Sequence, residues 1–210
     1  MFAFLISFLW WQFLVITVMS SGYHRYFSHQ SFEAPLWYEF YVLILGPLSG
    51  ALSCLLWAGI HRMHHAEADT SEDPHSPAYV GFWPVFLSTF SLEKLPRKYT
   101  RDLAVNPRIM FFHKHRYKLK AASLLLLLLI LPLKWFLVFA ISPMLWGYLA
   151  FGLVNTIGHR QGFPENTIVA NILTPGEGNH AYHHKHPNEY YITPWWDPTA
   201  WFINLIRTNN

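Results

Sequence analysis

Two histidine triplets with the same spacing constrain this chain more than any other feature. The segments His61–His65 and His180–His184 both read His-x-x-His-His. Histidines at positions i, i+3 and i+4 share one side of a helix. Neutral imidazole is a strong ligand for first-row transition metals, so each triplet has the character of half a metal site. We therefore expect a fold that brings the two triplets together around a shared metal centre.

The composition indicates an integral membrane protein. Hydrophobic residues make up 52% of the 210 residues and charged residues only 13%, whereas soluble domains carry about 25% charged residues. The single cysteine, Cys54, excludes an internal disulfide framework and a cysteine-based metal or iron–sulfur site. The length fits one domain, residues 1–210. The sequence has no phosphate loop or dinucleotide fingerprint, so reducing equivalents must come from a partner, and we expect no binding to nucleic acid.

Three apolar stretches predict membrane-spanning helices near residues 2–20, 116–131 and 135–156. The first carries no charge before Arg25. Its apolar core of about eighteen residues, at about 1.5 Å per residue, reaches roughly 27 Å, close to the thickness of a bilayer core. A cleaved signal peptide is the alternative. It is disfavoured because no basic region precedes the stretch and no small-residue cleavage site follows it.

A fourth apolar stretch, residues 36–60, is interrupted by Gly46–Pro47. Crossing the membrane once would place His61 on the opposite face from His29, and crossing it twice requires about 40 residues. We therefore expect an interfacial or re-entrant helical pair that starts and ends on the same side. An ordinary spanning helix is the alternative, and it would divide the histidines between two faces. The aromatic tail, residues 190–206, predicts an interfacial helix.

Most of the positive charge lies in one segment. Lys94–Lys120 contains nine of the fifteen Lys and Arg residues and one acid, Asp102. Positive charge beside membrane helices belongs on the cytoplasmic side, which is also the side of the histidines in the expected topology. The segment either docks anionic headgroups, an acyl carrier or an acidic electron donor, or only sets the topology. We interpret His113 and His115, which lie within it, as interfacial residues and not as ligands.

Two shorter motifs lie at the ends of apolar stretches. His24 and His29 are five residues apart, so on an α-helix their rings point to different faces. They could still flank one metal if the helix frays or ends between them. Asn155 and His159 close the last apolar stretch, and Asn155 lies one turn earlier on the same face.

Carboxylates follow the first triplet directly. Asp69, Glu72 and Asp73 are candidates to accept hydrogen bonds from the remaining N–H groups of the histidines. A solvated acidic loop is the alternative for each of them. His75 lies between two prolines and is interpreted as a loop residue.

Taken together and in this order, the motifs resemble those of the membrane fatty acyl desaturases, specifically the stearoyl-CoA and cyanobacterial acyl-lipid Δ9 group. The resemblance extends from about Gly22 to Trp201. It implies an all-α fold: an integral, multi-pass membrane helical bundle with a cytosolic histidine-rich helical cap and an active site on the cytoplasmic face. It also implies two iron ions, a water held by Asn155, and nine histidine ligands: His24, His29, His61, His64, His65, His159, His180, His183 and His184.

The implied reaction introduces a cis double bond, at the Δ9 position, into a saturated acyl chain carried by coenzyme A, acyl-carrier protein or a lipid. Dioxygen and an external electron donor, such as ferredoxin or a b-type cytochrome, would supply the oxidant and the electrons, because no side chain can oxidise an unactivated methylene. A related di-iron membrane lipid hydroxylase is one alternative. A non-enzymatic metal-binding membrane protein is the other, and it would be expected to place its ligands inside spanning helices.

The chain departs from the family at its N-terminal end. The family usually has two membrane helices before the first histidine pair, and here one apolar stretch precedes His24. Either the chain is naturally shortened or it is a fragment.

Overall fold

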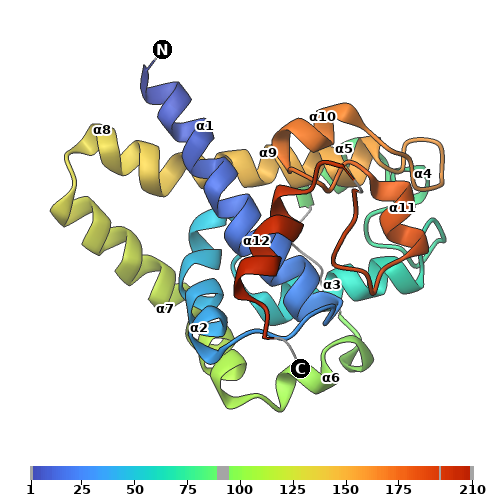
Figure 1. Cartoon of the computed structure of the whole chain (residues 1–210), viewed down its shortest axis with the longest axis horizontal. Coiled ribbons are helices and arrows are strands. Elements are labelled where there is room, and N and C mark those ends of the chain that lie inside the picture. The colour runs from blue at the N-terminus through green and yellow to red at the C-terminus, as the bar shows by residue number, and fades with distance from the viewer. Residues whose placement is uncertain (1, 89–94, 194, 209–210) are drawn as a thin grey trace.

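The computed structural model describes residues 2–88, 95–193 and 195–208, and the regular structure in these ranges is entirely helical (Figure 1). The all-α prediction is therefore confirmed. The elements are α1 (Phe2–Leu14), η1 (Val15–Ser28), α2 (Leu36–Leu45), η2 (Gly46–Ser49), α3 (Cys54–Ala66), α4 (Pro77–Val80), α5 (Phe82–Ser88), η3 (Arg97–Tyr99), α6 (Arg101–Ala104), α7 (Pro107–Ile130), α8 (Leu133–Phe136), η4 (Leu137–Ile141), α9 (Ser142–Ile157), α10 (Ile168–Leu173), α11 (His180–Lys185) and α12 (Pro198–Ile206).

Two helical rods are long and apolar enough to cross a membrane. One is α1 with η1, Phe2–Ser28, and the other is α8, η4 and α9, Leu133–Ile157. The rods are joined by indole groups, since Trp10 Nε1 donates to the Phe139 carbonyl at 3.1 Å and Trp146 Nε1 donates to the Ser7 hydroxyl at 2.8 Å. Burying these donors against the neighbouring rod satisfies them where water is excluded.

The predicted crossing at residues 116–131 corresponds to the second half of α7. This helix is continuous for 24 residues and begins within the basic segment. Its uncharged part is Ala121–Ile130, roughly 15 Å long at the usual helical rise. It is therefore not among the helices that qualify as spans on length and composition, and a third crossing here stays a prediction. Lys94, the first residue of the predicted basic segment, lies outside the described residues.

The apolar stretch 36–60 forms a bent pair of helices. The chain turns by 81° between Leu36–Ser49 and Cys54–Ala66, and the break lies at residues 50–53, where Gly50 has a φ of +93°. At Gly46–Pro47 the α-helix α2 ends and the chain continues as the 3-10 helix η2. His29 precedes the pair and His61 lies in its second helix, yet their Nε2 atoms are 2.8 Å apart. The pair therefore starts and ends on the same side of the molecule.

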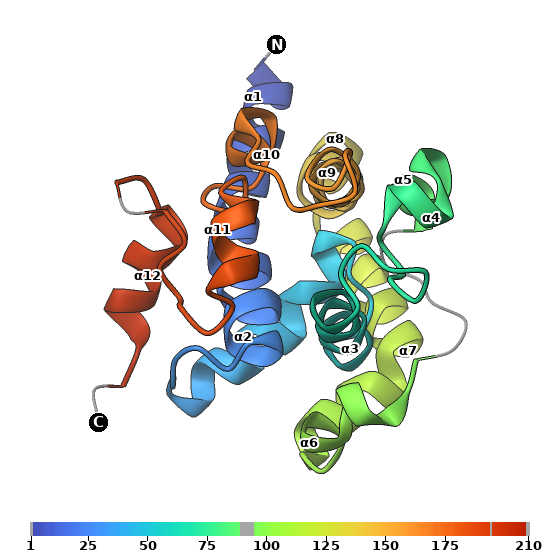
Figure 2. The same ribbon diagram turned by 90° about the vertical axis from the view of Figure 1, so that its right-hand side faces the viewer.

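The elements that carry histidines gather at one end. In Figure 1 the N-terminus and the turn between α7 and α8 lie toward the left, whereas α3, α4 and α11 lie toward the right. Figure 2 shows α12 on one side of the first rod and α3 on the other, and both pack against η1. The core between these elements is formed by Trp11, Leu14, Tyr23 and Tyr38, which are at most 1% exposed.

Candidate metal centre

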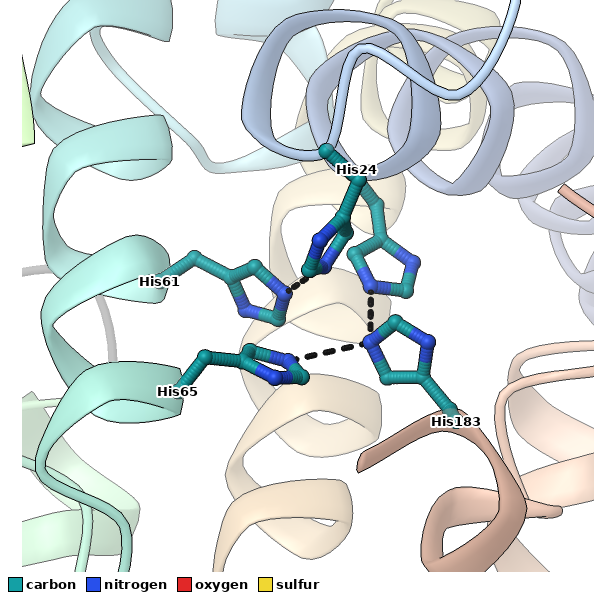
Figure 3. A group of neighbouring side chains, drawn as sticks. His24, His61, His65 and His183 are labelled. Carbon is teal, nitrogen blue, oxygen red and sulfur yellow. Dashed lines mark hydrogen bonds between the residues drawn. The ribbon is translucent and has the colours of Figure 1, made fainter. Parts of the chain in front are cut away.

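The nine histidines expected to act as ligands converge in two adjoining groups. Within each group, the ligand nitrogens all lie within 4.8 Å of one another. The five-histidine group consists of His24, His29, His61, His65 and His183, and the four-histidine group of His64, His159, His180 and His184. Figure 3 shows four rings of the first group pointing toward one another from η1, α3 and α11. The stacked rings of His65 and His184, with centroids 4.2 Å apart, join the two groups.

The distances between nitrogens fit metal coordination. In the five-histidine group, His183 Nε2 lies 2.9 Å from His24 Nε2 and 3.0 Å from His65 Nε2. In the four-histidine group, His180 Nε2 lies 2.8 Å from His159 Nε2 and 3.1 Å from His184 Nε2. Imidazole nitrogens bind metals at about 2.0–2.1 Å, which separates neighbouring ligands by roughly 3 Å in octahedral geometry. Both groups can therefore hold a metal ion.

Each triplet contributes to both groups. His61 and His65 enter the five-histidine group while His64 enters the four-histidine group. In the second triplet, His180 and His184 enter one group and His183 the other. Residues i and i+4 differ by about 40° around an α-helix, whereas adjacent residues diverge by about 100°. Each triplet thus supplies ligand candidates to both groups, and not to one group only.

A long π-helix explains how the first pair comes together. Val15–Ser28 is a π-helix, in which residue i bonds to residue i+5, so a spacing of five corresponds to one turn. The backbone N–H of His29 donates to the carbonyl of His24 at 3.1 Å, and the two ring centroids are 4.9 Å apart. The helix ends at Ser28, between the two histidines, as the expectation allowed, and the i to i+5 bond at its end brings their rings together.

Arg62, between the ligand candidates of α3, holds the end of this π-helix. Its Nε donates to the Ser28 carbonyl at 2.7 Å and its Nη2 to the Phe27 carbonyl at 2.8 Å. The other side of the guanidinium pairs with Asp102, with Nη1 and Oδ1 2.6 Å apart. The terminal carbonyls of a helix lack partners within it, so Arg62 fixes the position of His29 relative to α3.

Asn155 lies beside the histidines, as expected from its spacing. It lines a pocket of about 30 Å³ together with His24, His61 and His180. That volume has room for an ordered water between polar side chains. Trp57, Ile60, Phe151 and Val154 form the apolar wall of the same pocket. The pocket therefore places a polar amide and an apolar wall next to the rings.

Two of the three predicted carboxylates reach the histidines. Asp73 Oδ1 lies 2.9 Å from His64 Nδ1, and Asp69 Oδ2 lies 2.9 Å from His159 Nδ1. Such contacts fix the orientation of a ring and leave its Nε2 for the metal. Glu72, in contrast, is exposed in the same turn, where its backbone N–H bonds to Thr70 Oγ1. The structure does not bring Glu72 to the site, because the turn directs it to the surface.

Sequence reasoning missed a third carboxylate. Glu177 Oε2 lies 2.8 Å from His24 Nδ1, and the side chain is buried. Burial alone would raise the pKa of Glu177, but His24 and Arg25 outweigh it and bring the pKa to about 2, so the group is ionised. Its position between Gly176 and Gly178, just before the second triplet, was the available indication.

The three histidines of α11 are held in the neutral form that metals bind. Burial lowers the pKa of His180 and His183 well below the ordinary value, and neighbouring histidines add to the effect. For His184, burial and then His159 lower the pKa to about 3. Neutral imidazole at physiological pH is the state required of a ligand.

Three of the four other histidines are those interpreted above as loop or interfacial residues. His75 is buried beside His64, with ring centroids 5.5 Å apart, and lines the pocket near Asn155. His113 is hydrogen-bonded to the Ser53 hydroxyl at 2.8 Å, and His115 contacts Phe111 on α7. None of the three belongs to either histidine group formed by the described residues.

Fold and site together define an all-helical protein with two helices long and apolar enough to span a membrane and a candidate dinuclear centre of imidazoles. Comparison with known proteins specifies the class further, because the model of the family described as fatty acid desaturase matches residues 2–198. The chain belongs to the fatty acid desaturase family, which places it among the oxidoreductases.

The relatives include acyl-CoA and acyl-lipid enzymes. The sn-2 palmitoyl-lipid 9-desaturase of Nostoc sp. is 32% identical over 97% of this chain and 78% of its own length. The sn-1 stearoyl-lipid 9-desaturase of Anabaena variabilis is 29% identical over 89% of this chain and 74% of its own length. The probable acyl-CoA desaturase of Schizosaccharomyces pombe is 30% identical over 89% of this chain, which spans 43% of that protein.

Proposed function

We propose that this protein is a di-iron fatty acyl desaturase that introduces a cis double bond, at the Δ9 position, into a saturated acyl chain. The observation that carries the proposal is the convergence of the ligand nitrogens in two adjoining groups. Nitrogen-only ligation suits redox-active iron, and zinc, which has no redox chemistry, would not serve an oxidation. The names of the relatives support the position of the double bond.

The five-histidine group would hold one iron and the four-histidine group the other. When bound, the two ions supply the oxidising power, drawn from dioxygen, that breaks unactivated C–H bonds. The protein's own task is orientation and exclusion of water. Asp69 and Asp73 hold the rings of His159 and His64 in the tautomer that presents Nε2 to the centre.

The pocket beside the rings supports an acyl substrate. Trp57 and Phe151 line it on the apolar side, and Asn155 supplies a polar group for a water. An apolar wall would align methylene carbons next to the imidazoles without polar contacts along the chain. The carrier of the acyl chain could be coenzyme A, acyl-carrier protein or a glycerolipid, because the wall would contact only the hydrocarbon.

We infer a multi-pass topology with the site on the cytoplasmic face. Exposed cations on η3, α6 and α7, of which η3 and α7 pack against the histidine-bearing helix α3, support this orientation: Arg97, Lys98, Arg101, Lys114 and Lys118. The same charges suit the approach of an acidic electron donor, such as a ferredoxin or a b-type cytochrome, because opposite charges steer association.

The test is expression in a host that lacks its own desaturase, followed by mass spectrometry of the lipids. The proposal expects products lighter than the saturated chain by two hydrogens, with the double bond at the ninth carbon. Products heavier by one oxygen would instead identify a hydroxylase. Saturated lipids alone, from protein that is present in the membrane and loaded with iron, would contradict a desaturase.

A further inference from the structure

A buried charged network lies behind one ring of the five-histidine group. Glu177 is 4% exposed, and its Oε2 lies 2.8 Å from His24 Nδ1. Its other oxygen, Oε1, lies 3.3 Å from Arg25 Nη2 and accepts a hydrogen bond from the Ser20 hydroxyl. Both oxygens of the carboxylate are therefore held, and the one that faces His24 cannot turn away without breaking these contacts.

The network continues to the C-terminal segment. Arg25, 1% exposed, donates from Nη1 to Asp197 Oδ1 at 3.0 Å and to the Tyr190 carbonyl at 2.7 Å. Asp197 is fully buried and also accepts the backbone N–H groups of Ile192 and Ala200, each at 2.9 Å. The bond to Ala200 caps the first turn of α12. Helix α12 is thus connected to His24 through three side chains.

Gly176 makes this close packing possible. Its φ of +96° is unfavourable for other residues, and a Cβ there would lie 2.8 Å from Asp197 Oδ1 and 3.0 Å from Arg25 Nη2. Only glycine lets the chain leading to Glu177 pass between the guanidinium and the carboxylate. The backbone is therefore shaped to deliver this one carboxylate to His24.

The charges of the network do not cancel. Glu177 and Asp197 carry two negative charges, and Arg25 carries one positive charge, with all three side chains at most 5% exposed. An uncompensated buried carboxylate is strongly destabilising. The remaining negative charge faces the Nδ1 side of His24, where an N–H made more acidic by a cation at Nε2 would balance it. The charge count therefore suits a metal ion on the far side of this ring.

We propose that Glu177, held by Arg25 and Asp197, is a positioning residue for His24 and thereby for the metal of the five-histidine group. This inference rests on the proposed function. Glu177 acts on one metal position only, since the four-histidine group has its own carboxylates, Asp69 and Asp73. Removing the charge of Glu177 weakens metal binding at one position and leaves the other unchanged.

The experiment measures Co²⁺ binding to the metal-free protein in detergent, by competition with a fluorescent chelator and by the d–d absorption bands. Two ligand-deficient backgrounds separate the positions: His184→Ala disables the four-histidine group, and His29→Ala disables the five-histidine group. Glu177→Gln is introduced into each. The matched control is Glu189→Gln, because Glu189 is exposed and bonds to Tyr182.

In the His184→Ala background, Glu177→Gln is expected to weaken Co²⁺ binding by about 10- to 100-fold and to shift the d–d bands, as for other residues that orient metal ligands. In the His29→Ala background it should change neither. Glu189→Gln should be without effect in both. Equal weakening in both backgrounds, or no weakening in the first, overturns the proposal.

Two further variants keep the test decisive. Asp197→Asn should produce a smaller weakening of the same position, because it acts on His24 only through Arg25 and Glu177. If Glu177→Gln does not fold, Ser20→Ala is the substitute, because it removes one hydrogen bond to the carboxylate. It should weaken Co²⁺ binding at the same position several-fold. Unchanged binding in Ser20→Ala would count against the proposal. Failure of the intact protein to bind two Co²⁺ ions would contradict the metal centre itself, whereas two tightly bound ions that are indifferent to these variants would contradict only the role of Glu177.

Discussion

Acidification should strongly destabilise the metal-free protein, because its buried histidines resist protonation. Burial is the main cause that lowers the pKa of His29, His180, His183 and His184, in the last case to about 3. In the unfolded chain each of these histidines has a pKa of about 6.5. As the pH falls below that value the unfolded state takes up protons that the folded state does not, so stability is fully present above about pH 6.5 and is lost toward pH 3.

The size of the effect follows from the number of groups. At about pH 5.5 a histidine such as His184, which has a pKa of about 6.5 when unfolded and about 3 when folded, costs about 1.4 kcal/mol. Four such histidines together cost about 5–6 kcal/mol, which approaches the whole stability of many proteins, about 5–15 kcal/mol. A bound metal replaces the proton on each ring, so the metal-loaded protein should resist the same change in pH until the metal is released.

The assay is chemical unfolding of metal-stripped protein in detergent, followed by tryptophan fluorescence between about pH 7.5 and pH 5.5. The slope of the free energy of unfolding against pH gives the number of protons taken up on unfolding. His184→Gln should reduce that slope by about one proton. A free energy of unfolding that stays constant over this range, or a slope unchanged in His184→Gln, would refute the reasoning.

Three further outcomes are expected. His184→Ala should abolish unsaturated product in the lipid profile whereas His115→Ala should not, and equal loss in both would show that the ligands are wrongly assigned. Gly147→Ala should lower the free energy of unfolding by about 1–3 kcal/mol, because its Cβ would collide with the backbone carbonyl of Ser49. An unchanged free energy of unfolding would mean that α9 and η2 are not in close contact. Arg62→Met should cost about 1–3 kcal/mol in the same measurement, since it leaves the backbone carbonyls of Phe27 and Ser28 without their donor, and an unchanged free energy of unfolding would show that these bonds do not hold the π-helix.

The features visible in the sequence were those carried by local spacing. The i, i+3, i+4 pattern places the histidines of His61–His65 on neighbouring sides of α3, and helix geometry alone determines this. Asp69 and Asp73 follow the same triplet closely, so a short turn returns them to the rings. The apolar run from Phe2 likewise forms a helix that is long and apolar enough to span a membrane.

Features that depend on distant contacts were not visible. The π-helical form of Val15–Ser28 coincides with close packing on α2, where a Cβ on Gly22 would lie 2.6 Å from the Val42 side chain. No local pattern distinguishes such a helix from an α-helix. Glu177 lies 152 residues from Arg25 in the chain, so the pairing of the two depends on the complete fold. The division of each triplet between two metal positions likewise depends on how α3 faces α11.

The central claim is that the two histidine groups hold two iron ions. It is tested most directly by the iron content of protein purified anaerobically in mild detergent, measured together with the Mössbauer spectrum after loading with ⁵⁷Fe. The account predicts two irons per chain in nitrogen-rich sites, with one of them lost in His29→Ala and the other in His184→Ala. Protein that is folded but binds far less than two irons per chain, or keeps both in these variants, would contradict it.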